Sequence, residues 1–275
     1  MKSTRSSVEL DLVGTRFTLT LDEDRLLTPL ESLWRPFIAK DETSMSSTHL
    51  KFMVRAVERP YFDMEGIPRW HANDMWSVLY GSRLYMVQKA LENVRDRVYL
   101  HAAVLERDGK GLLLVGRYDS GKTSYAIELC REGWNLLSDD VALIDPRSLS
   151  VDWFPKPLGI KRSPWNELRG LLGPEFDWMP IPSDAFLLPA DAFSLTKTVD
   201  RVETIVFLEF DGTANPAICE VSVARAASLC ADCSGAVDQK TLDTWLALAR
   251  NAQCVLLVHA GVKSGMFPLD SLVSA

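Results

Sequence analysis

The residues with the clearest chemical potential form one short segment, residues 116–123. Gly116, Gly121, Lys122 and Thr123 are spaced there as G-x-x-x-x-G-K-T. Glycines at these two positions allow backbone N–H groups to turn inward around a phosphate. The lysine ammonium supplies a charge for the outer phosphates of a nucleotide, and the threonine hydroxyl suits a Mg²⁺ site. The spacing therefore predicts a phosphate-binding loop that opens a helix.

The residues on either side of this segment support the same interpretation. Residues 112–115 are an apolar run that predicts a buried strand, and residues 123–132 have helical spacing and end at Gly133, a helix-capping residue type. Residues 99–105 are also largely apolar, and the D-G step at 108–109 predicts a tight turn. We therefore expect an antiparallel hairpin to lead into the loop.

Two adjacent carboxylates, Asp139 and Asp140, follow the short apolar run at residues 134–137. Carboxylates at the end of a strand, one helix downstream of a phosphate-binding loop, can face the nucleotide. One can hold a metal ion, and the other can accept a proton from an incoming hydroxyl. Asp139 is a Mg²⁺ ligand or a partner that orients Lys122. The alternative for Asp140 is a carboxylate satisfied by backbone N–H groups.

The combination of the phosphate-binding loop, its flanking strands and helix, and the two carboxylates resembles the HPr kinase/phosphorylase family and its shorter HPr-kinase-related relatives. The resemblance is carried by residues 100–104, 116–124, 131–133 and 137–140, and it covers roughly residues 95–165. Residues 155–161 are more similar to the relatives than to HPr kinase itself. The resemblance implies an α/β fold with a P-loop kinase core of the HPr kinase/PEP-carboxykinase type, in which a mixed sheet has flanking helices. It also implies ATP and Mg²⁺ as cofactors.

The resemblance also implies which residues form the site. Asp140 takes the role of general base, and His101 lies where the family has a functional histidine, although a lone histidine in an apolar strand is more often a packed core residue. The catalytic set is Asp140, Asp139, His101 and Lys122. The metal ligands are Thr123 and Asp139. The nucleotide-binding set is Gly116, Arg117, Tyr118, Asp119, Ser120, Gly121, Lys122, Thr123 and Ser124.

The roles of several further residues are left open by the sequence. Glu167 and Glu209 are candidates for a second metal ligand. Lys156, Lys161 and Arg162 either clamp phosphates or are surface cations. The remaining histidines have no neighbours in the sequence that indicate chemistry.

The activity implied by the resemblance is an ATP-dependent serine kinase. Its acceptor would be a serine hydroxyl of a peptide or protein, and some relatives phosphorylate ribosomal precursor peptides of the lasso type. Two alternatives are a P-loop nucleotide hydrolase and a nucleotide-dependent regulatory or scaffold protein. The sequence leaves open the acceptor, the reverse reaction and the oligomeric state, although a homo-oligomer is possible.

Composition limits the other function classes. The chain has 275 residues, is 47% hydrophobic and 24% charged, and carries a net charge of -7. Without a basic block, that charge argues against nucleic-acid or anionic-membrane partners. We find no signal peptide, and no apolar run approaches the roughly 20 residues that span a bilayer. Five cysteines in mostly apolar surroundings indicate reduced thiols and a cytoplasmic location. Cys230 and Cys233 form a C-x-x-C pair that we expect to be structural.

The rest of the chain divides into an N-terminal extension, residues 1–95, packed on a catalytic core, residues 96–275. The extension is expected to hold a hairpin at 8–21, a helix at 26–38, a strand at 50–57, an irregular segment at 61–71 and a long helix capped by Asn73. In the core we expect a hairpin at 141–154, strands at 202–210, 218–223 and 254–259, and helices at 224–231 and 239–250. Between the hairpin at 141–154 and the strand at 202–210, we expect a short helix from Ser163-Pro164 and a loop at 173–196.

Overall fold

The structure is a computed structural model of the whole chain. It describes residues 6–39, 48–55, 60–64, 67–71, 73–154, 156–161, 185–189, 198–212, 215–235, 237–262, 265–266, 269 and 272. The chain forms two compact units. Unit 1 comprises Met1–Val94 and Lys156–Ala192, and unit 2 comprises Arg95–Pro155 and Phe193–Ala275. Lys156–Ala192, which we had placed in the core, thus groups with the N-terminal residues.

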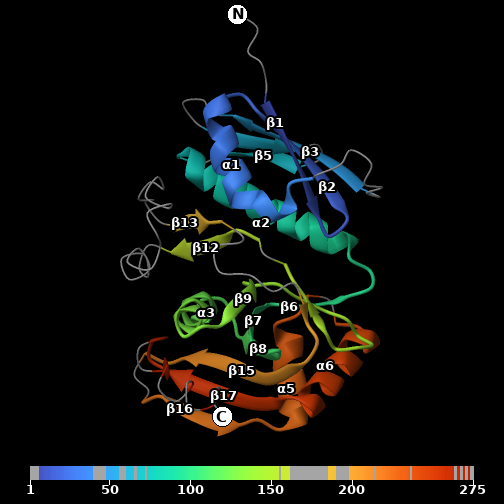
Figure 1. Cartoon of the computed structure of the whole chain (residues 1–275), viewed down its shortest axis with the longest axis vertical. Coiled ribbons are helices and arrows are strands. Elements are labelled where there is room, and N and C mark those ends of the chain that lie inside the picture. The colour runs from blue at the N-terminus through green and yellow to red at the C-terminus, as the bar shows by residue number, and fades with distance from the viewer. Residues whose placement is uncertain are drawn as a thin grey trace, which may run out of the picture. The chain divides into compact units, whose positions relative to one another are not determined.

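Unit 1 contains a five-stranded sheet in the order β1-β2-β3-β4-β5. Its strands are β1 (Ser6–Leu12), β2 (Thr15–Leu21), β3 (Thr48–Arg55), β4 (Tyr61–Met64) and β5 (Ile67–His71). Within the described residues of this unit, the helices are α1 (Leu27–Trp34), between the 3-10 turns η1 (Asp24–Leu26) and η2 (Arg35–Phe37), and α2 (Met75–Asn93). A separate antiparallel pair joins β12 (Leu158–Lys161) to β13 (Ala185–Leu188). Figure 1 labels most of these elements.

The alternating pattern of residues 8–21 forms the expected hairpin. The apolar side chains at alternate positions are buried, from Val8 in β1 to Leu21 in β2. Two expectations for this unit are wrong. The segment that we expected to be irregular forms the antiparallel strands β4 and β5, and the cap of α2 is Asp74, not Asn73. The Asp74 carboxylate accepts the Ser77 N–H at 2.8 Å. The helix expected from Ser163-Pro164 lies outside the described residues, as does most of the loop expected at 173–196.

Unit 2 contains a six-stranded mixed sheet in the order β16-β17-β15-β8-β7-β9. The strands are β16 (Ala217–Glu220), β17 (Gln253–His259), β15 (Val202–Phe210), β8 (Lys110–Val115), β7 (Ala102–Arg107) and β9 (Asn135–Ser138). β15 is parallel to both β8 and β17. β7 is antiparallel to both β8 and β9, so β8 and β9 run in the same direction.

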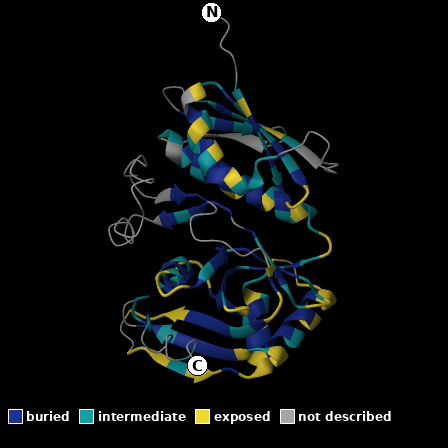
Figure 2. Ribbon diagram, viewed as in Figure 1, coloured by how far each residue is buried: buried dark blue, intermediate teal, exposed yellow. Residues whose placement is uncertain are grey.

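Among the described residues, unit 2 also contains three named helices and a smaller sheet. The helices are α3 (Lys122–Arg131), α5 (Val223–Asp232) and α6 (Gln239–Asn251). The smaller antiparallel sheet contains β14 (Thr198–Val199), β11 (Val151–Asp152), β10 (Ala142–Ile144) and β6 (Val98–Leu100). β15 and β17 are mostly buried, whereas β16, the outermost strand of the large sheet, is mostly exposed (Figure 2). The fold class is thus mixed α/β, with several sheets and flanking helices.

The strand directions bring five chain segments to one edge of the large sheet. Ala102 at the start of β7 pairs with Val115 at the end of β8, and Phe207 of β15 pairs with the same Val115. Phe210 pairs with His259 at the ends of β15 and β17. β9 also ends at this edge, since it runs parallel to β8. This edge therefore collects the residue before β7, the loop after β8 and the residues that follow β9.

Candidate functional site

The connection between β8 and α3 is a tight loop, which we call the glycine loop (Gly116–Gly121). Its turn is closed by the Ser120 N–H, which donates to the Arg117 carbonyl at 3.2 Å. Asp119 and Gly121 have left-handed backbone angles, with φ of 63° and 89°, and Gly121 is the N-cap of α3. A Cβ on Gly116 would collide with the Ser120 side chain. The loop therefore needs glycine at 116 for space, and glycine at 121 for backbone conformation.

Lys122 is buried at the base of this loop. Its side chain is 5% exposed, and Nζ donates to the carbonyls of Gly116 at 2.8 Å and Arg117 at 3.0 Å. Burial lowers the pKa of Lys122, and the carboxylates of Asp140 and Asp139 act in the opposite direction. A cation is thus fixed beside the backbone of the glycine loop.

Asp139 and Thr123 join the end of β9 to the first turn of α3. The Thr123 Oγ1 hydroxyl donates to the Asp139 carboxylate, at 3.0 Å from Oδ1 and 3.2 Å from Oδ2. Hydroxyl and carboxylate oxygens are hard ligands of the kind that Mg²⁺ prefers. The described residues contain no group of three or more His, Cys, Asp or Glu side chains that could hold a metal. The pair fits a Mg²⁺ ion that takes its remaining ligands from phosphates and water, not one held by protein alone.

His101 and Asp140 contact each other. His101 Nδ1 lies 3.1 Å from the Asp140 carbonyl oxygen, so Nδ1 carries the hydrogen, and Nε2 lies 3.9 Å from Asp140 Oδ1. The Tyr99 hydroxyl donates to the same carbonyl at 3.3 Å, and Asp140 has a left-handed φ of 65°. The Asp140 carboxylate is 33% exposed. Its backbone is thus held while its side chain can be reached from solvent, and His101 is not simply a core residue.

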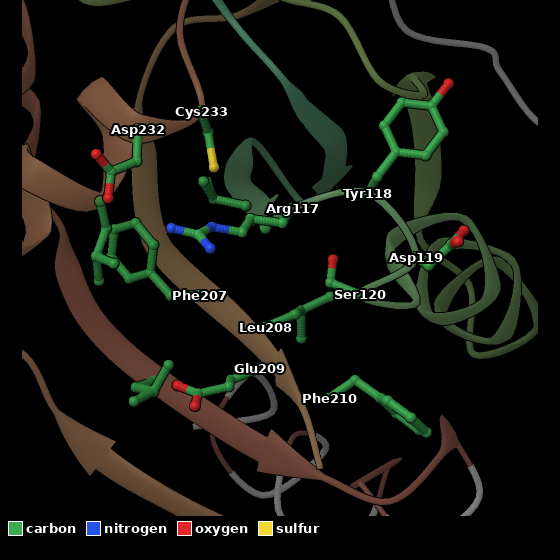
Figure 3. Close-up of a pocket in the computed structure, with 14 residues that line it drawn as sticks. Arg117, Tyr118, Asp119, Ser120, Phe207, Leu208, Glu209, Phe210, Asp232 and Cys233 are labelled. Carbon is green, nitrogen blue, oxygen red and sulfur yellow. The ribbon is translucent and has the colours of Figure 1, made fainter. Parts of the chain in front are cut away.

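A cavity of about 530 Å³ adjoins the glycine loop on the β15 side. Its walls are the loop backbone, the end of β15 and the C-terminal end of α5, with Phe207, Leu229 and Leu256 as apolar lining residues. Figure 3 shows the Arg117 side chain pointing toward Asp232 and Cys233, while the Tyr118 ring points the opposite way. The lining of the cavity is therefore largely apolar, with the charged side chains of Arg117, Asp119, Glu209 and Asp232 distributed around it.

Cys233 belongs to this region, which the C-x-x-C spacing did not reveal. Its carbonyl accepts the His101 N–H at 2.8 Å, and its side chain lines the cavity. Burial raises the pKa of the Cys233 thiol, and Lys122 and Arg117 oppose that shift. Its partner Cys230 is fully buried, and all five cysteines are free. Cys233, the C-cap of α5, thus connects the end of that helix to His101, which lies between β6 and β7.

The remaining candidates are placed as follows. Tyr118 is 76% exposed and its ring stacks on His101, with the ring centroids 5.9 Å apart. Ser124 is the third residue of α3, and Glu209 is exposed at the cavity wall. Lys156 and Lys161 belong to unit 1, and Lys156 is buried. Arg162 and Glu167 lie outside the described residues.

One contact of the glycine loop was missed from the sequence. His259, the last residue of β17, is 1% exposed, and its Nε2 lies 3.1 Å from the Ser120 carbonyl oxygen. A histidine at the end of an apolar strand gives little indication of this contact, because β17 is distant from the loop in the sequence. Only the sheet order, in which β15 separates β17 from β8, brings the two together.

No family model matches the chain, and no curated protein matches its sequence. Among solved structures, the chain is similar to the HPr(Ser) kinase/phosphatase from Coxiella burnetii, with 12% identity over 64% of this chain and 90% of that chain, and a TM-score of 0.30. A likeness at this identity and TM-score assigns no function to the chain. None of the helices within the described ranges has the length and apolar character to cross a bilayer.

Proposed function

We propose that this protein is an ATP-dependent phosphotransferase that moves the γ-phosphate of ATP to a serine hydroxyl of a peptide or protein. The observation that carries the proposal is the assembly of four groups at one sheet edge. These are the glycine loop, the buried Lys122 ammonium, the Thr123–Asp139 pair and the accessible Asp140 carboxylate. Together they supply anion binding, charge neutralisation, a place for Mg²⁺ and a proton acceptor, which are the parts that phosphoryl transfer requires.

The phosphates would lie against the glycine loop and the N-terminus of α3. The first N–H groups of a helix lack partners within the helix and attract anions, and the helix dipole adds to this attraction. Lys122 Nζ, already held at the loop by two carbonyls, is in place to contact the outer phosphates. Thr123 and Asp139 would hold Mg²⁺, which neutralises charge on the phosphates when it is bound.

Asp140 is the proposed general base. It takes the proton from the acceptor hydroxyl while that oxygen forms a bond to the γ-phosphorus, and the bond between the γ-phosphorus and the bridging oxygen breaks to release ADP. His101 Nε2, at 3.9 Å from the Asp140 carboxylate, can orient the carboxylate or exchange the proton with it. The hydrogen on His101 Nδ1 is engaged with the Asp140 carbonyl, which fixes the ring.

The nucleoside would occupy the cavity beside β15. The carboxylates follow β9, which lies on one side of β8, whereas the cavity lies at β15, on the other side. A triphosphate with its γ end toward Asp140 extends its nucleoside away from β9 and so toward β15. The apolar walls of the cavity suit a base.

A peptide or protein acceptor is proposed from the family resemblance of residues 95–165. Two exposed aromatic side chains fit such an acceptor, since Tyr118 of the glycine loop is 76% exposed and Phe210 at the end of β15 is 56% exposed. Exposed aromatic groups near a site are suited to being covered by a partner. The free cysteines agree with a proposed cytoplasmic location.

Incubation with γ-³²P-labelled ATP, Mg²⁺ and a panel of serine-containing peptides and proteins tests the proposal. Label on a serine supports a kinase. Release of labelled phosphate without labelled acceptor indicates a nucleotide hydrolase. Binding of ATP without either product indicates a nucleotide-dependent regulatory protein, and no binding of ATP would overturn the assignment of the glycine loop.

A further inference from the structure

His259 is remote from the glycine loop in sequence but bonded to it in the fold. It ends β17, is 1% exposed, and its Nε2 lies 3.1 Å from the carbonyl oxygen of Ser120. A carbonyl oxygen only accepts hydrogen bonds, so Nε2 carries the hydrogen and donates it. The bond spans 139 residues of sequence. It fixes one peptide group of the loop from the far side of β15.

We infer that His259 is a positioning residue that orients the Ser120–Gly121 peptide group so that its N–H can bind a phosphate oxygen. The peptide bond is planar and trans, so its C=O and N–H point in opposite directions. Holding the Ser120 carbonyl toward His259 therefore turns the Gly121 N–H away from His259. Gly121 is the N-cap of α3, where N–H groups lack helical partners and attract anions. The inference rests on the proposed nucleotide-binding function.

The imidazole of His259 is itself held in place from several sides. The Tyr125 ring packs edge-on against it at a centroid distance of 4.9 Å, and the Phe210 ring lies at 5.7 Å. The His259 carbonyl accepts the Asp211 N–H at 2.9 Å. A Cβ built on Gly121 would lie 3.4 Å from the ring, so the loop is already close to it. The ring is thus wedged between α3, the loop and the end of β15.

A hydrogen-bond donor is needed at this position because the surroundings are buried. A neutral imidazole with its hydrogen on Nε2 supplies this donor, and burial, which lowers the pKa of His259 against the opposing effect of the Ser120 and Gly261 backbone, favours that neutral form. An apolar residue of similar size would leave the Ser120 carbonyl without this donor. The peptide group would then lose the constraint that directs the Gly121 N–H.

The test compares His259→Leu, which removes the donor, with His259→Gln, whose Nε2–H₂ donor can take the place of the imidazole Nε2–H. Val255→Ala is the matched control, because it removes buried volume from β17 without touching the loop. Mg²⁺·ADP affinity is measured by isothermal titration calorimetry, and thermal unfolding is measured for each variant. We expect His259→Leu to bind about tenfold more weakly, the effect of one lost hydrogen bond. His259→Gln should recover at least part of the affinity, and Val255→Ala should bind normally.

Three results would overturn the inference: unchanged affinity in His259→Leu, an equal loss in Val255→Ala, or no recovery in His259→Gln. If His259→Leu does not fold, His259→Asn replaces it, since its shorter amide does not reach Ser120, and the same comparison holds. Failure of the proposed function looks different, because the unmodified protein would then not bind Mg²⁺·ADP at all.

Discussion

The Thr123 hydroxyl donates to the Asp139 carboxylate at 3.0 Å and so joins the first turn of α3 to the end of β9. The two residues lie 16 positions apart, and the rest of α3 and the whole of β9 lie between them in sequence. The contact places two hard oxygen groups together beside the glycine loop. Under the proposed function, this pair is where Mg²⁺ would bind, and it distinguishes Asp139 from its neighbour Asp140.

Asp139→Asn should raise the Mg²⁺ concentration needed for half-maximal activity by about tenfold, because the amide lacks the carboxylate charge. Titration of phosphoryl transfer with MgCl₂ measures this. Glu209→Gln is the control, since Glu209 is exposed at the cavity wall and is one of the two candidates for a second metal ligand. An equal effect of both substitutions would contradict the assignment of the metal to Thr123 and Asp139.

The substitution Lys122→Met should weaken phosphate binding without lowering the stability of the fold. The ammonium is buried and its pKa is lowered by burial, so the fold gains little from its charge. We expect ADP affinity to fall at least about tenfold, because charge-assisted bonds to phosphate are lost. The thermal midpoint should stay within a few degrees or rise. A large fall in the midpoint with unchanged affinity would show that Lys122 is a structural cation.

Filling the cavity should weaken binding of the nucleoside part of ATP but not binding of its phosphates. Leu229→Trp adds volume at the cavity wall, and we expect it to weaken ATP binding about tenfold or more by excluding the base. Binding of inorganic tripolyphosphate, which has no base, should be unchanged. Leu229→Ala enlarges the cavity and controls for the loss of leucine. Equal weakening of both ligands by Leu229→Trp would place the nucleoside elsewhere.

Acid should destabilise the protein partly through His259. Burial lowers its pKa in the folded state, so between the unfolded pKa of about 6.5 and the lower folded value the unfolded chain binds more protons. The free energy of unfolding should therefore fall as the pH drops through this window, and it should be insensitive to His259 above it. Urea denaturation between pH 5 and 8, compared with His259→Gln, measures the contribution. An identical pH profile in the variant would contradict it.

Local sequence patterns were enough for the central part of the site. The strand ending at Val115, the helix beginning at Lys122 and the carboxylates after β9 each depend on neighbours in the chain, and their elements match the structure within a residue or two. Glycine is needed at Gly116 for space and at Gly121 for a left-handed backbone, and the G-x-x-x-x-G-K-T spacing already specifies glycine at both positions. The roles of these residues in binding and catalysis stay predictions.

Long-range contacts account for what the sequence did not reveal. His259 and Cys233 contact the site only because the sheet order and α5 bring the chain back to the edge where β8 ends. The grouping of Lys156–Ala192 with the N-terminal residues likewise depends on contacts that no local pattern encodes. The strands β4 and β5 were missed because Gly66 and Pro68 obscured their alternation.

The most direct measurement of the central claim compares the native protein with Asp140→Asn in single-turnover transfer from γ-³²P-labelled ATP to a serine acceptor. The account predicts that Asp140→Asn binds Mg²⁺·ATP as tightly as the native protein but transfers phosphate at least about a hundredfold more slowly, the usual contribution of a general base. Equal transfer rates in the two proteins would contradict the account.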